Sequence, residues 1–394
     1  MSIETQFLFI ALLSTFSQGA NMHNFCLIFG AGAIGKSVAG FAFSKVGYRP
    51  IFVDVSADVI NDLNERKEYR IYESSESFST VKEASCLNIK DLKAVIDLAS
   101  QAEYICTSTG ENGIEDVLYI LSEANKIRKK RPLYVLFCEN LKNIEKISKD
   151  FLDNPTGKFV GRLIPTSIER MAKIYISSKN QYDVIAEEFY PIIIGEEISK
   201  DSQLLNGHPK AFMPVSNLEA YYARKVCTNN LGHAVLGYMG YQKNYMNLTE
   251  AAQDLEIRSV LLMALNEAGK MLQIKYGFSE EEIGAHIDNL INIRYINNNL
   301  DDQINRVARD PARKLHRGER LIGTALSCMD CGIYPNAILE TVEYAVKYDN
   351  KAEQATIELN ALFRKGKVNK ILTDICGLKH GEPLYNDLCI RLSK

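Results

Sequence analysis

The sequence predicts an α/β protein in which an N-terminal, doubly wound Rossmann-type sheet is followed by a mainly α-helical C-terminal domain. Two observations support this fold class. Apolar strand-like runs alternate with helical patterns in the first half of the chain, and helical apolar spacing dominates after about residue 200. The chain has 394 residues, 46% of them hydrophobic, which is enough for two hydrophobic cores.

The first βαβ unit is expected to begin at FCLIF, residues 25–29. This continuous apolar run is typical of a parallel strand that is buried on both faces. A glycine turn and a helix that ends at Gly47 follow it, and a second apolar strand ends at Asp54. Strand, turn, helix and strand in this order form one βαβ unit.

The alternation continues after this unit. Strands are expected at about 104–109 (YICTST) and 133–138 (LYVLFC), and residues 114–127 between them have helical spacing. Such alternation predicts a doubly wound parallel sheet. We assign residues 22–200 to a dinucleotide-binding domain.

Helical apolar spacing dominates the C-terminal half, for example at residues 223–241, 257–278 and 336–348. The stretch EEISKDSQLLNGHPKAFMP between the two halves is polar and contains glycine and proline, as is typical of a domain boundary. We assign residues 201–394 to a helical domain that carries the substrate and catalytic residues.

Residues 1–21 are expected to form an N-terminal extension outside the fold. The apolar run from Phe7 to Phe16 resembles the core of an export signal, but Glu4 precedes it where such a signal has Lys or Arg. The run is also too short to span a bilayer, and we find no other candidate membrane segment. We therefore expect a cytoplasmic protein that does not contact the membrane.

The composition indicates a small-molecule partner. A net charge of -3 gives no overall electrostatic reason to bind nucleic acid. The nine cysteines lack the spacing of a disulfide framework, which indicates reduced thiols. Cys328 and Cys331 form one C-x-x-C pair without a second, so we expect no metal site. We expect a monomer or a small homo-oligomer.

A glycine motif indicates a dinucleotide site. Gly30, Gly32 and Gly35 satisfy G-x-G-x-x-G between a strand and a helix. The first glycine allows a tight turn, the second lets the backbone approach a pyrophosphate, and the third lets helix and strand pack closely. Asp54 can accept both ribose hydroxyls and would repel a 2′-phosphate, which favours NAD over NADP. The predicted cofactor-binding residues are Gly30, Ala31, Gly32, Ala33, Ile34, Gly35, Asp54, Thr109 and Asn140.

The segment KVCTNNLGHA, residues 225–234, contains the candidate catalytic residues Lys225, Asn230 and His233. At about 100° per residue, Asn230 lies about 140° from Lys225 and His233 about 80°, so all three project over one broad helix face. Burial there would lower the pKa of a lysine toward neutrality and make its amine a general base. The same pattern is also compatible with a solvated helix face.

Several motifs in this chain occur in the order found in one enzyme family. Lys225, Asn230 and His233 reproduce its K-x4-N-x2-H motif. The other stretches are FGAGAIG (29–35), CEN (138–140), RLIP (162–165), KYGF (275–278), RYINNNLDD (294–302) and RVARDPARKLHRGERLI (306–322). From residue 24 to about 350, the chain therefore resembles the polyol-specific long-chain dehydrogenase/reductase, or mannitol dehydrogenase, family. By length it is most similar to the mannitol-1-phosphate 5-dehydrogenase branch.

This resemblance implies a metal-independent oxidoreductase that moves a hydride between NAD and a sugar alcohol or ketose. Mannitol 1-phosphate and fructose 6-phosphate would be the favoured pair. Lys225 would be the general acid/base. Asn230 and His233 would hydrogen-bond the reacting oxygen and stabilise developing alkoxide charge.

The resemblance also implies a substrate site in the cationic stretch near residue 310. Arg306 and Lys314 match the spacing of the family's substrate-binding Arg and Lys, and Arg313 lies between them. Such a cluster could hold the phosphate of a hexitol phosphate or the carboxylate of a sugar acid. We predict Arg306, Lys314 and Arg313 as substrate-binding residues.

Departures from the family pattern leave three alternatives open. Gly157, Gly161 and Gly195 stand where the family has polar or acidic residues, so the substrate could be a hexuronate or an unphosphorylated polyol. Lys225 and Asn229 also fit the K-x3-N spacing of β-hydroxyacid dehydrogenases and ketopantoate reductases. The third alternative is an NAD-binding module that has lost its activity.

Overall fold

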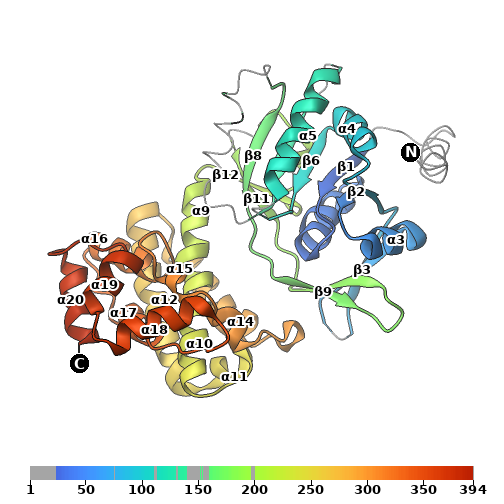
Figure 1. The fold of residues 1–394 in the computed structure, drawn as a ribbon. Helices are drawn as coiled ribbons and strands as arrows, with labels where there is room; N and C mark the ends of the chain where they lie inside the picture. Colours follow the sequence, from blue (N-terminus) through green and yellow to red (C-terminus); the bar gives the residue numbers. More distant parts are fainter. Residues whose placement is uncertain are drawn as a thin grey trace. The chain divides into compact units, whose positions relative to one another are not determined.

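The computed structural model describes residues 24–74, 76–110, 113–129, 132–139, 151, 153, 159–196 and 200–393. The chain divides into two compact units between Leu218 and Glu219 (Figure 1). Strand β12 (Phe212–Val215), which follows the boundary expected at residue 200, pairs within the sheet of the first unit. The expected extension at residues 1–21 lies outside the described residues.

An eight-stranded sheet forms the centre of the first unit. In spatial order its strands are β12 (Phe212–Val215), β11 (Ile192–Gly195), β8 (Arg162–Ser167), β7 (Tyr134–Phe137), β6 (Tyr104–Thr107), β1 (Phe25–Phe29), β2 (Arg49–Asp54) and β5 (Ser85–Asn88). Neighbouring strands are parallel except for β8 and β11. The chain order reverses between β1 and β6, so their carboxyl ends form the switch point of a doubly wound sheet.

Helices cover both faces of this sheet (Figure 1). On one face lie α4 (Leu92–Gln101) and α5 (Ile114–Ile127). On the other lie the π-helix Gly35–Gly40 and α2 (Phe41–Lys45), and α3 (Ala57–Arg66) packs beside them. Successive residues of β1 therefore point into two different cores, and all of them are buried. This double burial explains the continuous apolar run that predicted the strand.

The first unit also contains a second sheet of four strands, which the sequence did not predict. In spatial order its strands are β4 (Phe78–Lys82), β3 (Glu68–Tyr72), β10 (Tyr182–Ala186) and β9 (Ala172–Ile176). Most of their residues are partly or fully exposed, so they lack the apolar runs by which we recognised the strands of the large sheet. A short helix, α8 (Gln203–Gly207), precedes β12.

The named elements of the second unit are all helices, which confirms the predicted fold class. In chain order they are α9 (Leu218–Arg224), the π-helix η3 (Lys225–Asn230), α10 (Leu231–Gln242), α11 (Leu248–Gln253), α12 (Leu255–Tyr276), α13 (Glu280–Asn289), the π-helix η4 (Leu290–Arg294), the 3₁₀ turn η5 (Asn298–Leu300), α14 (Ile304–Ala308), α15 (Pro311–Leu315), α16 (Ile322–Asp330), α17 (Asn336–Val346), α18 (Gln354–Arg364), α19 (Val368–Lys370), the π-helix η6 (Ile371–Ile375) and α20 (Pro383–Leu392). Among the described residues, no helix has both the length and the apolar character needed to cross a bilayer.

Helix α10 forms the centre of the second unit. Its residues from Leu231 to Gly240 are buried apart from His233, which is partly exposed. A helix that is apolar on all sides belongs in a core, and α10 packs against α11, α12, α14 and α17. Gly240 allows this close packing, because a Cβ there would lie 2.8 Å from the Ile304 side chain and 2.9 Å from that of Ala251. The core therefore holds rigidly the helix that continues from η3.

Candidate functional site

The three glycines of the turn after β1 have different surroundings. Gly30 has φ +96°, and a Cβ there would lie 2.4 Å from the carbonyl oxygen of Ser108. A Cβ on Gly35 would lie 2.0 Å from the carbonyl oxygen of Gly30. A Cβ on Gly32 would meet nothing within 4 Å. The first and third glycines are thus required by the fold, whereas the second faces open space that a pyrophosphate could approach.

Asp54 ties the end of β2 to this glycine turn. Its Oδ2 accepts the backbone N–H of Ala31 at 2.7 Å, and its Oδ1 accepts those of Val55 and Ser56 at 2.8 and 2.9 Å. The carboxylate is partly exposed and keeps lone pairs for further donors. Two ribose hydroxyls are donors of the required kind, so the turn and Asp54 together fit NAD.

The other predicted cofactor residues lie around the same switch point. Ala33 and Ile34 begin the helix after the turn, and both are partly exposed. Thr109 follows β6 and donates its N–H to Glu139 Oε1 at 3.0 Å. Glu139 was part of the CEN motif but was not predicted as a site residue, and its Oε2 is buried with no partner among the described residues. Asn140, the next residue, lies outside the described residues.

The candidate catalytic helix differs from the expectation in its geometry. Lys225–Asn230 is a π-helix, in which backbone hydrogen bonds run from residue i to residue i+5. The rotation of 100° per residue that we used for Lys225, Asn230 and His233 is therefore wrong for this segment. Lys225, Asn230 and His233 are each partly exposed, so they do not lie on a fully solvated face.

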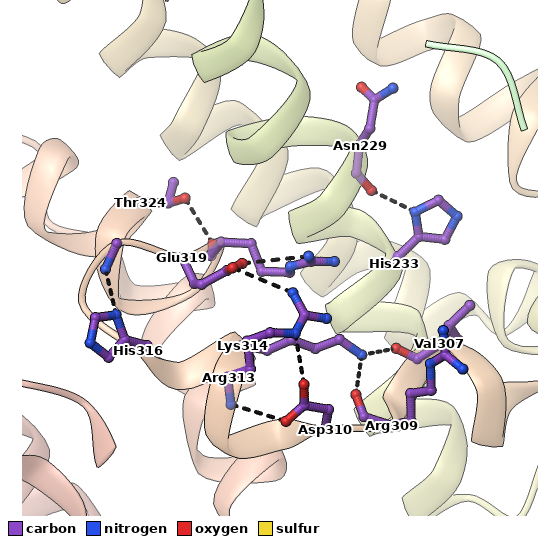
Figure 2. A network of polar contacts seen from close by, with 12 residues as sticks. Asn229, His233, Val307, Arg309, Asp310, Arg313, Lys314, His316, Glu319 and Thr324 are labelled. Atoms are coloured by element: carbon purple, nitrogen blue, oxygen red, sulfur yellow. Dashed lines mark hydrogen bonds and ion pairs between the residues drawn. The ribbon is translucent and has the colours of Figure 1, made fainter. Parts of the chain in front are cut away.

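His233 is held as a neutral imidazole. Its Nδ1 lies 2.8 Å from the carbonyl oxygen of Asn229, as Figure 2 shows. A carbonyl can only accept, so Nδ1 carries the proton and Nε2 keeps its lone pair. Burial, together with the nearby cations Arg294 and Arg320, lowers the pKa of His233 to about 3. Nε2 is buried without a partner among the described residues and is available to accept a hydrogen bond.

Tyr295 supports the same carbonyl, a contact that sequence reasoning missed. Its hydroxyl donates to the Asn229 carbonyl oxygen at 3.1 Å, and its ring packs edge-on against the His233 ring at 5.2 Å. Tyr295 is 1% exposed and occupies the space beside Gly232, where a Cβ would lie 2.2 Å from the tyrosine oxygen. Tyr295 lies within the RYINNNLDD stretch, which was the only signal for it.

Asn229 is more deeply buried than Asn230. It is 2% exposed, and its Oδ1 lies 3.0 Å from Nε2 of His286 and 3.0 Å from Oγ1 of Thr228. Thr228 Oγ1 also donates to the carbonyl oxygen of Arg224 at 2.6 Å. Burial, together with Arg224 and Arg294, lowers the pKa of His286 to about 3. Sequence reasoning missed His286 as a member of this cluster.

The three predicted substrate-binding cations all have protein partners. Arg306 pairs with Asp302, and Arg313 pairs with Asp310 at 2.7 Å. Lys314 is 3% exposed, and its Nζ donates to the carbonyls of Val307 and Arg309, as Figure 2 shows. Burial and the neighbouring arginines lower the pKa of Lys314 to about 7.

Arg320 belongs to the same cationic stretch but was not predicted as a site residue. Its Nε is buried without a hydrogen-bond partner among the described residues, and its closest carboxylate, that of Glu319, lies 3.5 Å away. Its charge acts on His233, as do those of Arg294 and Arg306. Arg320 is thus a cation near the candidate catalytic residue His233 with remaining donor capacity.

Of the departures from the family pattern, Gly161 and Gly195 lie in the described part of the chain. Gly161 lies close to Phe159, since a Cβ there would be 2.6 Å from that ring, and Gly195 ends β11. Gly157 lies outside the described residues.

Family models match both units of the chain. The mannitol dehydrogenase Rossmann domain matches residues 25–206, and the mannitol dehydrogenase C-terminal domain matches residues 217–371. The chain belongs to the mannitol dehydrogenase family. It is therefore an NAD-dependent oxidoreductase that acts on a CH–OH group of a sugar alcohol, which confirms the class and the cofactor expected from the sequence.

Similar family members include three bacterial mannitol-1-phosphate 5-dehydrogenases. That of Brevibacillus brevis is 30% identical over 90% of this chain and 94% of its own length. That of Geobacillus stearothermophilus is 30% identical over 90% of this chain and 96% of its own. That of Bacillus subtilis is 30% identical over 93% of this chain and 99% of its own.

Solved structures with the same fold include two polyol dehydrogenases. Mannitol 2-dehydrogenase of Pseudomonas fluorescens, in a ternary complex with NAD and D-mannitol, is 13% identical and has a TM-score of 0.69 over 95% of this chain and 92% of that one. A D-sorbitol dehydrogenase in substrate-free form is 16% identical and has a TM-score of 0.68 over 83% of this chain and 81% of that one.

Alanine substitutions at two glycines of the turn after β1 should affect different properties, one the stability of the fold and the other the binding of NADH. Gly35→Ala should lower the free energy of unfolding by about 1–3 kcal/mol, because its Cβ overlaps backbone. Gly32→Ala should leave stability unchanged but weaken NADH binding at least about tenfold, because its Cβ fills the space needed by the pyrophosphate. Urea unfolding and NADH fluorescence titration measure the two effects. Wild-type NADH affinity in Gly32→Ala would contradict the assigned approach.

The low pKa of His286, which is partly exposed, predicts a loss of stability in acid. The folded pKa of His286 is lowered from 6.5 to about 3, so between these values the unfolded chain binds protons that the folded chain does not. The free energy of unfolding should therefore fall as the pH drops below about 6.5. His286→Gln should reduce this fall by about 1–3 kcal/mol between pH 6.5 and 4, measured by urea unfolding. His208→Gln, at an exposed position, is the control and should behave as wild type. If the free energy of unfolding of His286→Gln falls as steeply with pH as that of the wild type, the claim that His286 is neutral in the folded protein is wrong.

Proposed function

We propose that this protein interconverts a hexitol 1-phosphate and a ketohexose 6-phosphate, with mannitol 1-phosphate and fructose 6-phosphate as the favoured pair. The observation that carries the proposal is the neutral His233 with an unpartnered Nε2, close after Lys225 in the chain and near Arg294, Arg306 and Arg320. The relatives named mannitol-1-phosphate 5-dehydrogenase support the choice of substrate.

In this proposal Lys225 moves the proton. In the oxidation direction its neutral amine accepts the proton of the reacting hydroxyl, and in the reduction direction its ammonium returns it. NAD, when bound, accepts the hydride that leaves the carbinol carbon. The products are the ketone, NADH and one proton on the lysine, so the step is balanced.

In this scheme His233 orients a substrate hydroxyl other than the reacting one, because the reacting hydroxyl donates its only hydrogen to Lys225. Because its Nε2 has a lone pair and no proton, it can accept the hydrogen of a substrate hydroxyl but cannot donate to an alkoxide. We therefore assign the stabilisation of developing negative charge to Lys225 and to the amide of Asn230. This division gives His233 a narrower role than the family resemblance implied.

We propose Arg320, together with the predicted Arg306, Arg313 and Lys314, as the source of positive charge for the substrate phosphate. The unused Nε of Arg320 and the weak contact with Glu319 support this choice. Lys314, whose ammonium donates to two backbone carbonyls, would act through its charge and by shaping the turn between α14 and α15. We further propose that the enzyme works in the cytoplasm, where the nine unpaired cysteines would stay reduced.

A comparison of phosphorylated and plain sugars tests the substrate. NADH oxidation should proceed with a kcat/KM for fructose 6-phosphate about 100-fold or more above that for fructose, since each hydrogen bond to a charged group contributes about 1.5–3 kcal/mol. Equal values would remove the phosphate from the proposal. NADH binding without turnover of either ketose, or of hexitols and hexuronates, would favour an inactive NAD-binding module.

Removing the amine of Lys225 tests the mechanism. Lys225→Ala should lower kcat by about 10³-fold or more and leave the dissociation constant of NADH nearly unchanged, because proton transfer is lost while the glycine turn is intact. Lys270→Ala, at an exposed position of α12, is the control and should keep wild-type kcat. A Lys225→Ala enzyme that retains a tenth of the activity would rule out this role for the lysine.

A further inference from the structure

The K-x4-N-x2-H spacing does not match one face of a regular α-helix. In an α-helix, residues i, i+4 and i+7 share a narrow face, whereas Lys225, Asn230 and His233 stand at i, i+5 and i+8. The π-turn at Lys225–Asn230 lies between two α-helices, α9 and α10. A single π-turn within an α-helix acts as one inserted residue.

Subtracting this inserted residue brings the three positions into register. The separation from Lys225 to Asn230 then corresponds to four α-helical residues, which is a rotation of about 40° around the helix axis. The separation from Lys225 to His233 corresponds to seven residues, which is a rotation of about 20°. Without the π-turn, the same separations would be about 140° and 80°. The π-turn thus gathers the three backbone positions onto one narrow stripe.

Such a turn needs partners for carbonyl groups that leave the α-helical hydrogen-bond pattern. Side chains supply them here. The hydroxyl of Tyr295 lies 3.1 Å from the Asn229 carbonyl oxygen and 3.5 Å from that of Thr228. The hydroxyl of Thr228 donates to the Arg224 carbonyl, and Nδ1 of His233 also donates to that of Asn229.

Tyr295 is the only one of these donors that comes from another segment of the unit. It follows the π-helix η4, and its ring fits beside Gly232 only because Gly232 lacks a Cβ. The tyrosine therefore connects the π-turn to a part of the core that is distant in sequence. Its ring also contacts the ring of His233.

We propose that Tyr295 is a positioning residue for the oxidoreductase reaction. Its ring lies beside Gly232, and from there its hydroxyl holds the Asn229 carbonyl of the π-turn, which keeps Lys225 in register with Asn230 and His233. The proposal rests on the function proposed above. It assigns no contact between Tyr295 and the substrate. Loss of the hydroxyl should therefore reduce kcat through misplacement of the base rather than through loss of binding.

The test compares two buried tyrosines. Tyr295→Phe should lower kcat about 10- to 100-fold, as expected for a small misplacement of a reacting group, with KM for fructose 6-phosphate changed less than threefold and NADH affinity unchanged. Tyr385→Phe is the matched control, since Tyr385 is 6% exposed and its hydroxyl donates to Asn369 at 2.9 Å on the C-terminal helices. It should show a similar fall in melting temperature with wild-type kcat.

Two further measurements separate positioning from general destabilisation. In Tyr295→Phe, the limb of the pH profile of kcat that disappears in Lys225→Ala should shift by about half a pH unit or more, whereas the Tyr385→Phe profile should match wild type. Gly232→Ala should lower kcat strongly in the wild-type background and less in Tyr295→Phe, since the two changes disturb one contact.

The outcomes distinguish this inference from the proposed function. If Lys225→Ala abolishes turnover but Tyr295→Phe has the kcat and pH profile of Tyr385→Phe, the positioning role is wrong and the proposed function stands. If Lys225→Ala remains active, the proposed function fails, whatever the tyrosine variants do.

Discussion

The backbone carbonyl of Asn229 is the group on which the geometry of the candidate catalytic helix depends. It accepts one hydrogen bond from Nδ1 of His233 and another from the hydroxyl of Tyr295. The first bond fixes which imidazole nitrogen keeps a lone pair, and the second connects the π-turn to the core of the helical unit. One oxygen atom thus determines both the tautomer of the histidine and the register of the residues before it.

Burial of charge shapes the surroundings of this carbonyl. Arg294 and Arg320 act on His233, and together with desolvation they keep the imidazole neutral. The buried ammonium of Lys314 donates to the backbone carbonyls of Val307 and Arg309. This cation therefore stabilises the backbone of the stretch to which it belongs. The positive charges of Arg294, Arg306 and Arg320 nevertheless act on His233 of the candidate catalytic helix, where an anionic group of the proposed substrate would be attracted.

The glycine turn of the first unit depends on a simpler constraint, because backbone atoms leave no room for a side chain at two of its positions. Gly30 and Gly35 are fixed by backbone atoms that a Cβ would overlap, and Asp54 joins the turn through the Ala31 amide. Among the three glycines of this turn, Gly32 alone has open space where a Cβ would lie. The pairing of the turn with a carboxylate at the end of β2 was predictable because both are local consequences of a βαβ unit.

The sequence by itself determined the features that depend on short-range patterns: the buried strands, the glycine turn with Asp54, the helical C-terminal half and the K-x4-N-x2-H spacing. It did not reveal the small second sheet, whose strands are half-exposed and carry no apolar run. Nor did it reveal the π-turn or the burial of Asn229. It also did not reveal that Tyr295 and His286 are hydrogen-bond partners of Asn229. These depend on donors and space supplied by residues about 60 positions away, and only tertiary packing brings such groups to a carbonyl that a regular helix would have satisfied by itself.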